Sequence, residues 1–130
     1  MAETTESEFA GCRVLVVEDS FLIATALSDM LTKLGCEVVG PASTVADARG
    51  LIADRQPHLA VLDIALHHED STPIARELAA HDRPFTFLTG YDGARVLPED
   101  LRSRPCLQKP IEFEMLRRTL RGLRRSSGCG

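Results

Sequence analysis

The chain has 130 residues, of which 44% are hydrophobic and 26% charged, so it is long enough for one globular domain with a hydrophobic core. Its formal net charge of -4 argues against a general nucleic-acid binder, and no stretch approaches the roughly 18 consecutive apolar residues of a membrane span. The N-terminus has no basic region followed by an apolar one, so we expect no secretion signal, no membrane partner and a cytoplasmic location.

The first half of the chain alternates short apolar runs with helical periodicity. Residues 1–11 are acidic and polar, and we expect them to be disordered because a chain end is weakly tethered. The run RVLVV (13–17) predicts a strand, and apolar residues spaced three or four apart over 23–34 predict a helix that a glycine ends. The run CEVVG (36–40) predicts a second strand, and Thr44 with an aspartate three residues later is a typical N-cap signal for a second helix.

The second half continues the same alternation. HLAVLD (58–63) predicts the third strand, and the STP sequence after it offers a capping hydroxyl before a proline suited to the first turn of a helix. PFTFLTG (84–90) predicts the fourth strand, whereas 91–104 has little periodicity and predicts only a short or irregular helix. RPCLQKP (104–110) predicts the fifth strand, and apolar residues on one face of 113–123 predict a final helix.

Five strands that alternate with about five helices indicate an α/β fold with a parallel sheet. Parallel pairing needs crossover connections, which are right-handed and place helices on both faces, so we expect a doubly wound sheet. Continuously apolar strands such as LAVL agree with a sheet that is covered on both sides. The folded domain is predicted to span residues 12–125, followed by a flexible tail over 126–130.

Four cysteines are scattered along the chain without any C-x-x-C pair. This spacing fits neither a zinc site nor a disulfide scaffold. We expect Cys12, Cys36 and Cys106 to pack as small apolar residues and Cys129 to lie in the flexible tail.

Charged and polar residues follow the predicted strands at their carboxyl ends. Glu18 and Asp19 follow the first strand, Asp63 ends the third, Thr89 ends the fourth, and Lys109 ends the fifth. In open parallel sheets this edge is where sites form, at the point where the strand order reverses. We therefore expect three acids, a hydroxyl and an ammonium to converge there.

This set of groups has a specific chemistry. Two adjacent carboxylates repel each other, and with a third acid they suit a hard divalent cation, for which Mg²⁺ is a better candidate than zinc. A carboxylate next to such a cation can attack phosphorus, and Asp63 is the expected nucleophile because it stands alone at the end of the central strand. Lys109 would neutralise charge on the transferring group, and the Thr89 hydroxyl would donate a hydrogen bond to it.

The sequences VVEDS, VLDI, FLTG and QKP, at the ends of four predicted strands, resemble the receiver domain of two-component response regulators from about Arg13 to Leu123. The resemblance implies a flavodoxin-like five-stranded parallel sheet in the order 2-1-3-4-5. It also implies that Asp63 accepts a phosphoryl group from a histidine kinase or a histidine phosphotransfer protein, and that Lys109 pairs with the phosphate. Mg²⁺ would be held by Glu18, Asp19, Asp63 and the backbone carbonyl of Ala65.

The stretches PFTFLTGYDG and TPIARELAA are similar to the receiver subclass with the F-A-T-G-Y (FAT GUY) signature, which is often partnered with HWE or related histidine kinases, although Leu88 replaces its alanine. Many receivers also carry an aromatic switch residue three positions before the lysine, and here that position is Cys106. We expect Thr89 to act as a switch and Tyr91 to replace the missing aromatic. Ala65 has no polar group to position water, which leaves the lifetime of a phosphoryl group open.

The predicted function is a single-domain response regulator that is not an enzyme. We expect no effector domain after Gly130, and we therefore expect the protein to signal through protein contacts, or to relay or absorb phosphate, as a monomer or a phosphorylation-dependent dimer. A phosphatase-like enzyme with an aspartyl nucleophile is one alternative, although no acid stands two residues after Asp63. A pseudo-receiver that only binds partners is another. The loop from His67 to Asp70 could be mistaken for a metal cluster, and we expect it to be solvated.

Overall fold

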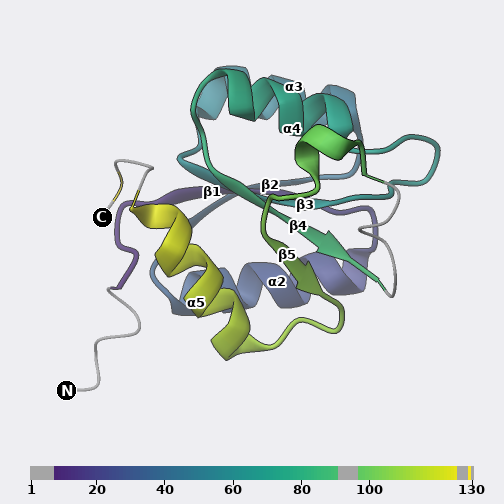
Figure 1. The fold of residues 1–130 in the computed structure, drawn as a ribbon. Helices are drawn as coiled ribbons and strands as arrows, with labels where there is room; N and C mark the ends of the chain where they lie inside the picture. The colour runs from purple at the N-terminus through teal and green to yellow at the C-terminus, as the bar shows by residue number, and fades with distance from the viewer. Residues whose placement is uncertain (1–7, 91–96, 126–128, 130) are drawn as a thin grey trace.

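The computed structural model of the chain describes residues 8–90, 97–125 and 129. Its centre is one sheet of five parallel strands in the order β2-β1-β3-β4-β5, which confirms the predicted fold class and strand order (Figure 1). The strands are β1 (Arg13–Val17), β2 (Glu37–Ala42), β3 (Leu59–Asp63), β4 (Phe85–Thr89) and β5 (Cys106–Gln108).

Helices cover both faces of this sheet, as the alternation of patterns predicted. They are α2 (Phe21–Lys33), α3 (Val45–Arg55), α4 (Thr72–Ala80) and α5 (Phe113–Arg124), with a short 3-10 helix η2 (Glu99–Leu101). In Figure 1, α3 and α4 lie above the sheet, and α2 and α5 lie below it. None of the helices in the described ranges is long and apolar enough to cross a membrane.

Successive side chains of β1 point to opposite faces, and this alternation divides the core into two layers. Leu15 and Val17 pack with the cluster that includes α3 and α4, whereas Val14 and Val16 pack with the cluster that includes α2 and α5. All four side chains are fully buried. The apolar run after Arg13 is therefore continuous because β1 is covered on both sides.

Helix starts follow the predicted caps in one case and depart from them in another. The Thr44 hydroxyl accepts a hydrogen bond from the Asp47 backbone N–H at 3.1 Å, which confirms the N-cap of α3. Ser71 occupies the N-cap position of α4, but its buried hydroxyl makes no capping hydrogen bond. The Asp70 carboxylate instead accepts from the Thr72 backbone N–H at 2.8 Å, so the acid takes the role expected of the hydroxyl.

Strand β2 extends beyond the predicted 36–40 as far as Ala42. Gly40 has a φ of +99°, and a Cβ there would lie 2.8 Å from the Ala42 backbone nitrogen and 3.1 Å from the Val16 carbonyl oxygen. Only glycine fits this close approach without a backbone shift. The strand pairing shifts at the same place, between Leu15 and Val17 of β1.

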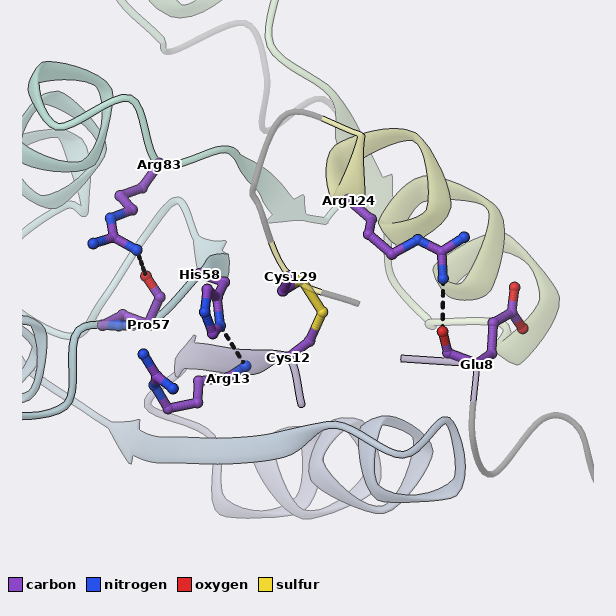
Figure 2. Close-up of a disulfide and its surroundings, with 8 residues drawn as sticks. All are labelled: Glu8, Cys12, Arg13, Pro57, His58, Arg83, Arg124 and Cys129. Atoms are coloured by element: carbon purple, nitrogen blue, oxygen red, sulfur yellow. Dashed lines mark hydrogen bonds between the residues drawn. A yellow bond between two sulfur atoms is a disulfide. The ribbon is translucent and has the colours of Figure 1, made fainter. Parts of the chain in front are cut away.

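The expectation that the cysteines form no disulfide was wrong, because Cys12 and Cys129 are bonded across a sequence separation of 117 residues (Figure 2). Cys12 directly precedes β1 and Cys129 follows α5, so the fold brings these two segments together. Cys36 is free and buried, as predicted, whereas Cys106 is free and exposed because it lies on the edge strand β5.

Part of the N-terminal segment expected to be disordered is packed against the domain. Phe9 is fully buried, and its backbone N–H donates to the Leu34 carbonyl at 3.0 Å. The Arg124 guanidinium lies over the Phe9 ring. It also donates a hydrogen bond to the Glu8 carbonyl at 2.6 Å, which Figure 2 shows. Burial of one aromatic ring and these polar contacts offset the entropy lost by ordering residues 8–11.

Between β4 and β5 the structure describes Gly90 and residues 97–105. Within this region, η2 is the short helix predicted between 91 and 104, and Leu97 and Leu101 are buried against the layer that contains α3 and α4. Tyr91, the predicted substitute switch, lies outside the described residues.

Candidate functional site

Three carboxylates meet at the carboxyl edge of the two central strands. Glu18 and Asp19 directly follow β1, and Asp63 is the last residue of the neighbouring β3, which is paired in parallel with β1. Each residue offers one oxygen, and these oxygens lie within 4.8 Å of one another. The structure therefore brings together the three acids that the sequence singled out.

Two of these acids are withdrawn from solvent. Glu18 is 2% exposed and Asp63 is 5% exposed. The Ser20 backbone N–H donates to Glu18 Oε2 at 3.0 Å, which holds the carboxylate at the start of α2. Burial and the nearby charge of Asp63 raise the pKa of the Glu18 carboxyl despite this hydrogen bond.

Lys109 supplies the positive charge. Its backbone N–H donates to the Thr89 carbonyl at 2.8 Å, which fixes it beside β4 directly after β5. Its Nζ lies 3.3 Å from Glu18 Oε1 and 3.3 Å from Asp63 Oδ2. Burial lowers the pKa of the ammonium, but the Asp63 and Glu18 carboxylates outweigh that effect and raise it.

The donor set fits a divalent cation. Glu18 Oε1 is buried and has no hydrogen-bond partner among the described residues, although Lys109 contacts it as an ion pair. Three carboxylates and one ammonium leave two negative charges to be balanced. Oxygen ligands of this kind suit Mg²⁺, which binds through one or more carboxylates and retains several waters. Ala65 lies in the loop after β3, where it forms an isolated antiparallel bridge with Asp70.

Thr89 is at the predicted place, at the end of β4, and is 7% exposed. Its hydroxyl donates to the carbonyl of Gly90 at 3.0 Å. The structure therefore places Thr89 beside the site, with its hydrogen bond directed to the neighbouring backbone.

His67 contacts one of the three acids, a contact that the sequence analysis did not predict. Its Nδ1 lies 2.6 Å from Asp19 Oδ2, although its side chain is 76% exposed as expected for a loop. The two residues are 48 positions apart, so no local spacing connects them. The available signal was that His67 follows β3 at the same sheet edge where Asp19 follows β1.

Comparisons with known proteins agree with this geometry. The family model described as "Response regulator receiver domain" matches residues 14–121. The chain is 29% identical over 112 residues to the sensory transduction protein LytT of Bacillus subtilis (strain 168), a match that covers 84% of this chain and 46% of that protein. It is 34% identical over 90 residues to the transcriptional regulatory protein PdtaR of Mycobacterium tuberculosis (strain ATCC 25618 / H37Rv), a match that covers 68% of this chain and 44% of that protein. The chain thus spans about half the length of these curated relatives.

A solved structure provides a more complete match. The solution structure of SdrG from Sphingomonas melonis Fr1 has a TM-score of 0.77 and 40% sequence identity, and the match covers 86% of this chain and 95% of that one. SdrG has also been solved in a BeF3-activated conformation, which matches with a TM-score of 0.74 and covers 88% of this chain and 97% of that one.

Proposed function

The chain belongs to the response regulator receiver domain family, and we propose that it switches state when Asp63 accepts a phosphoryl group in the presence of Mg²⁺. The observation that carries this proposal is the geometry around Asp63. Its carboxylate lies 3.3 Å from the Lys109 ammonium and within 4.8 Å of oxygens from Glu18 and Asp19. Three carboxylates and the Lys109 ammonium therefore share one edge of the sheet, which supports a nucleophile beside a cation and an ion.

The phosphoryl donor would be a phosphohistidine on a histidine kinase or a phosphotransfer protein. An Asp63 oxygen attacks phosphorus, the P–N bond breaks, and the leaving imidazole retains the electron pair and takes up a proton. Lys109 neutralises charge on the transferring group from its position beside Asp63. Mg²⁺, held by Glu18, Asp19, Asp63 and the Ala65 carbonyl, would supply further charge neutralisation at the phosphoryl oxygens.

The response to phosphorylation would begin at Thr89. We propose that its hydroxyl leaves the Gly90 carbonyl and donates to a phosphoryl oxygen instead, because a charged acceptor forms a stronger hydrogen bond than a neutral one. That rotation would draw the segment after β4 toward the site and repack the 90–110 face, with Tyr91 as the proposed aromatic partner of the switch.

The donor protein would dock at the start of α2. Phe21 and Leu22 are 81% and 79% exposed, directly after the acids and Ser20. Leu22 also lines an open apolar groove of about 430 Å³ that reaches Lys109 and Pro110. A partner that covers these apolar groups would bring its histidine to the sheet edge where Asp63 lies, and we propose an HWE or related histidine kinase as that partner.

Phosphoryl transfer to Asp63 can be tested by radiolabelling from a panel of purified, phosphorylated histidine kinases. We expect Mg²⁺-dependent labelling of the wild-type protein by its cognate kinase and no labelling of Asp63→Asn, because an amide is a poor nucleophile. Cys106→Ala is the matched control, since this thiol is exposed on β5 and takes no part in the proposed transfer. Labelling of the Asp63→Asn protein to the wild-type extent would refute the proposal, because Asp63 would then not be the acceptor.

A second measurement tests whether Asp63 can accept a phosphoryl group without requiring the cognate kinase. Beryllofluoride, the reagent named for the activated form of SdrG, should shift the amide resonances of Thr89 and Lys109 in the wild-type protein when Mg²⁺ is present. The Asp63→Asn protein should show no such shift. If beryllofluoride leaves the wild-type spectrum unchanged, the acid cluster is not a phosphoryl site.

A further inference from the structure

We propose that the C-terminal ends of α3 and α4 form a docking surface for a protein segment that carries an acidic side chain beside an apolar one. The surface consists of two open pockets that share Arg83. Arg83 lies just before the amino end of β4, whereas Asp63 is at the carboxyl end of β3. The inference therefore goes beyond phosphoryl transfer and does not depend on it.

The first pocket, which we call the helix pocket, offers apolar walls to a partner. It lies between α3 and α4, which are side by side on one face of the sheet (Figure 1). Ile52 and Ala53 come from the end of α3, Leu78 comes from the end of α4, and Pro57 follows α3. The pocket has a volume of about 320 Å³, so it can accommodate an apolar side chain of a partner.

The second pocket, which we call the arginine pocket, has a volume of about 240 Å³ and is lined by Arg83 and Arg104. Arg83 Nη1 donates to the Pro57 carbonyl at 3.1 Å, and the Arg104 guanidinium lies 4.8 Å from the centre of the Phe85 ring. These contacts position both side chains without cancelling their charges. Among the described residues, neither arginine pairs with a carboxylate.

Arg83 retains donors for a partner. Figure 2 shows one terminal nitrogen of its guanidinium directed at the Pro57 carbonyl and the other directed away from it. A guanidinium has five N–H donors, and a carboxylate can accept two of them at once. An acidic side chain placed in the arginine pocket can therefore bind Arg83 without displacing the Pro57 contact.

The surroundings of His58 show that positive charge dominates near Arg83. Burial lowers the pKa of His58, and the charges of Arg13 and Arg83 lower it further, against the weaker opposing effect of Glu37. The whole chain has a formal net charge of -4, so this positive region is a local concentration of charge. It favours an acidic partner.

The composition of the two pockets favours a protein segment over a nucleic acid. Asp82 lines the arginine pocket together with Arg83 and Arg104, and its carboxylate would repel a chain of phosphates. The helix pocket offers apolar side chains, which a phosphate backbone cannot use. A peptide can place one carboxylate at the arginines and one apolar side chain in the helix pocket.

Fluorescence anisotropy of the full chain with short labelled peptides tests the proposal. The probe is a peptide of repeated Leu-Glu-Ser units, which presents a leucine beside a glutamate in every repeat. We expect it to bind about tenfold more tightly than peptides of repeated Leu-Gln-Ser or Ala-Glu-Ser units, because each of these lacks one of the two groups. The amide resonances that the probe shifts should be concentrated at Leu78, Arg83 and Arg104.

Substitutions identify the arginines responsible. Arg83→Ala and Arg104→Ala should each weaken binding of the probe about tenfold, and Arg104→Ala leaves the Pro57 contact in place. Arg102→Ala is the matched control, because Arg102 is exposed in the same segment as Arg104 and lines neither pocket. Asp82→Asn should strengthen binding, since it removes a like charge and asparagine tolerates the φ of 57° at this position.

Several results would overturn the proposal. One is a probe that binds the wild type no more tightly than the two control peptides do. Another is equal weakening by Arg102→Ala and Arg104→Ala, which would indicate attraction to the general positive field. Tighter binding of oligothymidylate than of the probe, with the same dependence on Arg104, would mean that the surface recognises phosphates. Asp63→Asn should bind the probe as tightly as wild type, so failure of the proposed phosphoryl transfer would leave this test unaffected.

Discussion

Charge balance among single side chains explains why the sheet edge suits both an ion and a phosphoryl group. Glu18 and Asp63 are buried almost completely, and burial of two carboxylates costs free energy unless cations lie nearby. Lys109 compensates one of these charges at 3.3 Å from each acid. With Asp19 included, two negative charges remain, which is the charge that a divalent cation balances. Lys109 alone therefore does not neutralise the three acids.

Leu22 illustrates how one exposed residue can affect a partner without affecting the chemistry. We predict that Leu22→Ala slows phosphoryl transfer from the cognate kinase about tenfold, because the apolar surface lost on truncation lies beside Lys109 and would be buried by the donor protein. Phosphorylation by a small donor such as acetyl phosphate should proceed at the wild-type rate, since it needs no docking surface. Rapid-quench labelling measures both rates.

The control for this substitution lies on the same helix. Asp29 is exposed on α2 and does not line the apolar groove, so Asp29→Ala should leave transfer from the kinase unchanged. Equal slowing with the kinase and with acetyl phosphate would show that Leu22 supports the fold of the site and not docking.

At the level of helices and strands, the sequence predicted an element correctly where the spacing of apolar residues and the residues that end helices or strands agree. The continuous apolar run of β1 and the three- and four-residue spacing up to Leu34 predicted the strand and helix that the structure contains. The acids that end β1 and β3 could be assigned to one site because parallel strands share a carboxyl edge. Contacts that depend on side-chain direction were not predictable, since His67 and Asp19 are 48 residues apart and lie in separate connections.

The N-terminal segment was misjudged for a related reason. Glu8 and Phe9 look like part of a polar tail by composition, but their partners on α5 are more than 100 positions away. Glu8 receives a hydrogen bond from Arg121 Nε at 2.9 Å and from Arg117 Nη1 at 3.2 Å. The composition of a terminal segment indicates how weakly it is held by its own neighbours in sequence. It cannot predict contacts with residues that only the fold brings close.

Glu8 therefore gives a prediction about how α5 is held. Burial raises the pKa of the Glu8 carboxyl, but the hydrogen bonds and charges of Arg121 and Arg117 outweigh it and lower the pKa below 4.5. A carboxyl whose pKa is lowered in the folded state stabilises that state above its unfolded pKa, and this stabilisation is lost as pH falls through the folded pKa. We predict that Glu8→Gln lowers the free energy of unfolding by about 0.5–1 kcal/mol at pH 7, and that the difference from wild type shrinks as pH falls below 4.5.

Urea denaturation followed by circular dichroism at several pH values measures this difference. Glu114→Gln is the matched control, because Glu114 pairs with Arg117 within α5 and does not connect the helix to another segment. A loss in Glu8→Gln that persists undiminished at low pH would mean that the side chain acts through packing and not through its charge.

In the molecule as a whole, the cluster of three acids and the disulfide lie at opposite ends of β1. The acids follow the carboxyl ends of β1 and β3, whereas Cys12 directly precedes the amino end of β1. Figure 2 shows a further contact at the same end, where the Arg13 backbone N–H donates to His58 Nδ1 at 3.0 Å beside the disulfide. The disulfide and the contacts beside it therefore lie away from the three acids along β1.

This separation predicts that the Cys12–Cys129 bond affects stability but not ion binding. A crosslink that spans 117 residues restricts the unfolded chain strongly, and such bonds typically contribute about 2–4 kcal/mol. We expect reduction, or the double substitution Cys12→Ser and Cys129→Ser, to lower the thermal midpoint by roughly 10 °C and to leave Mg²⁺ affinity unchanged. The reductant should have no effect on the double variant, because Cys36 is buried with its pKa raised to about 12 and forms no bond. Equal midpoints for oxidised and reduced wild type would show that this bond does not stabilise the fold, and a change in Mg²⁺ affinity on reduction would show that the two ends of β1 are coupled.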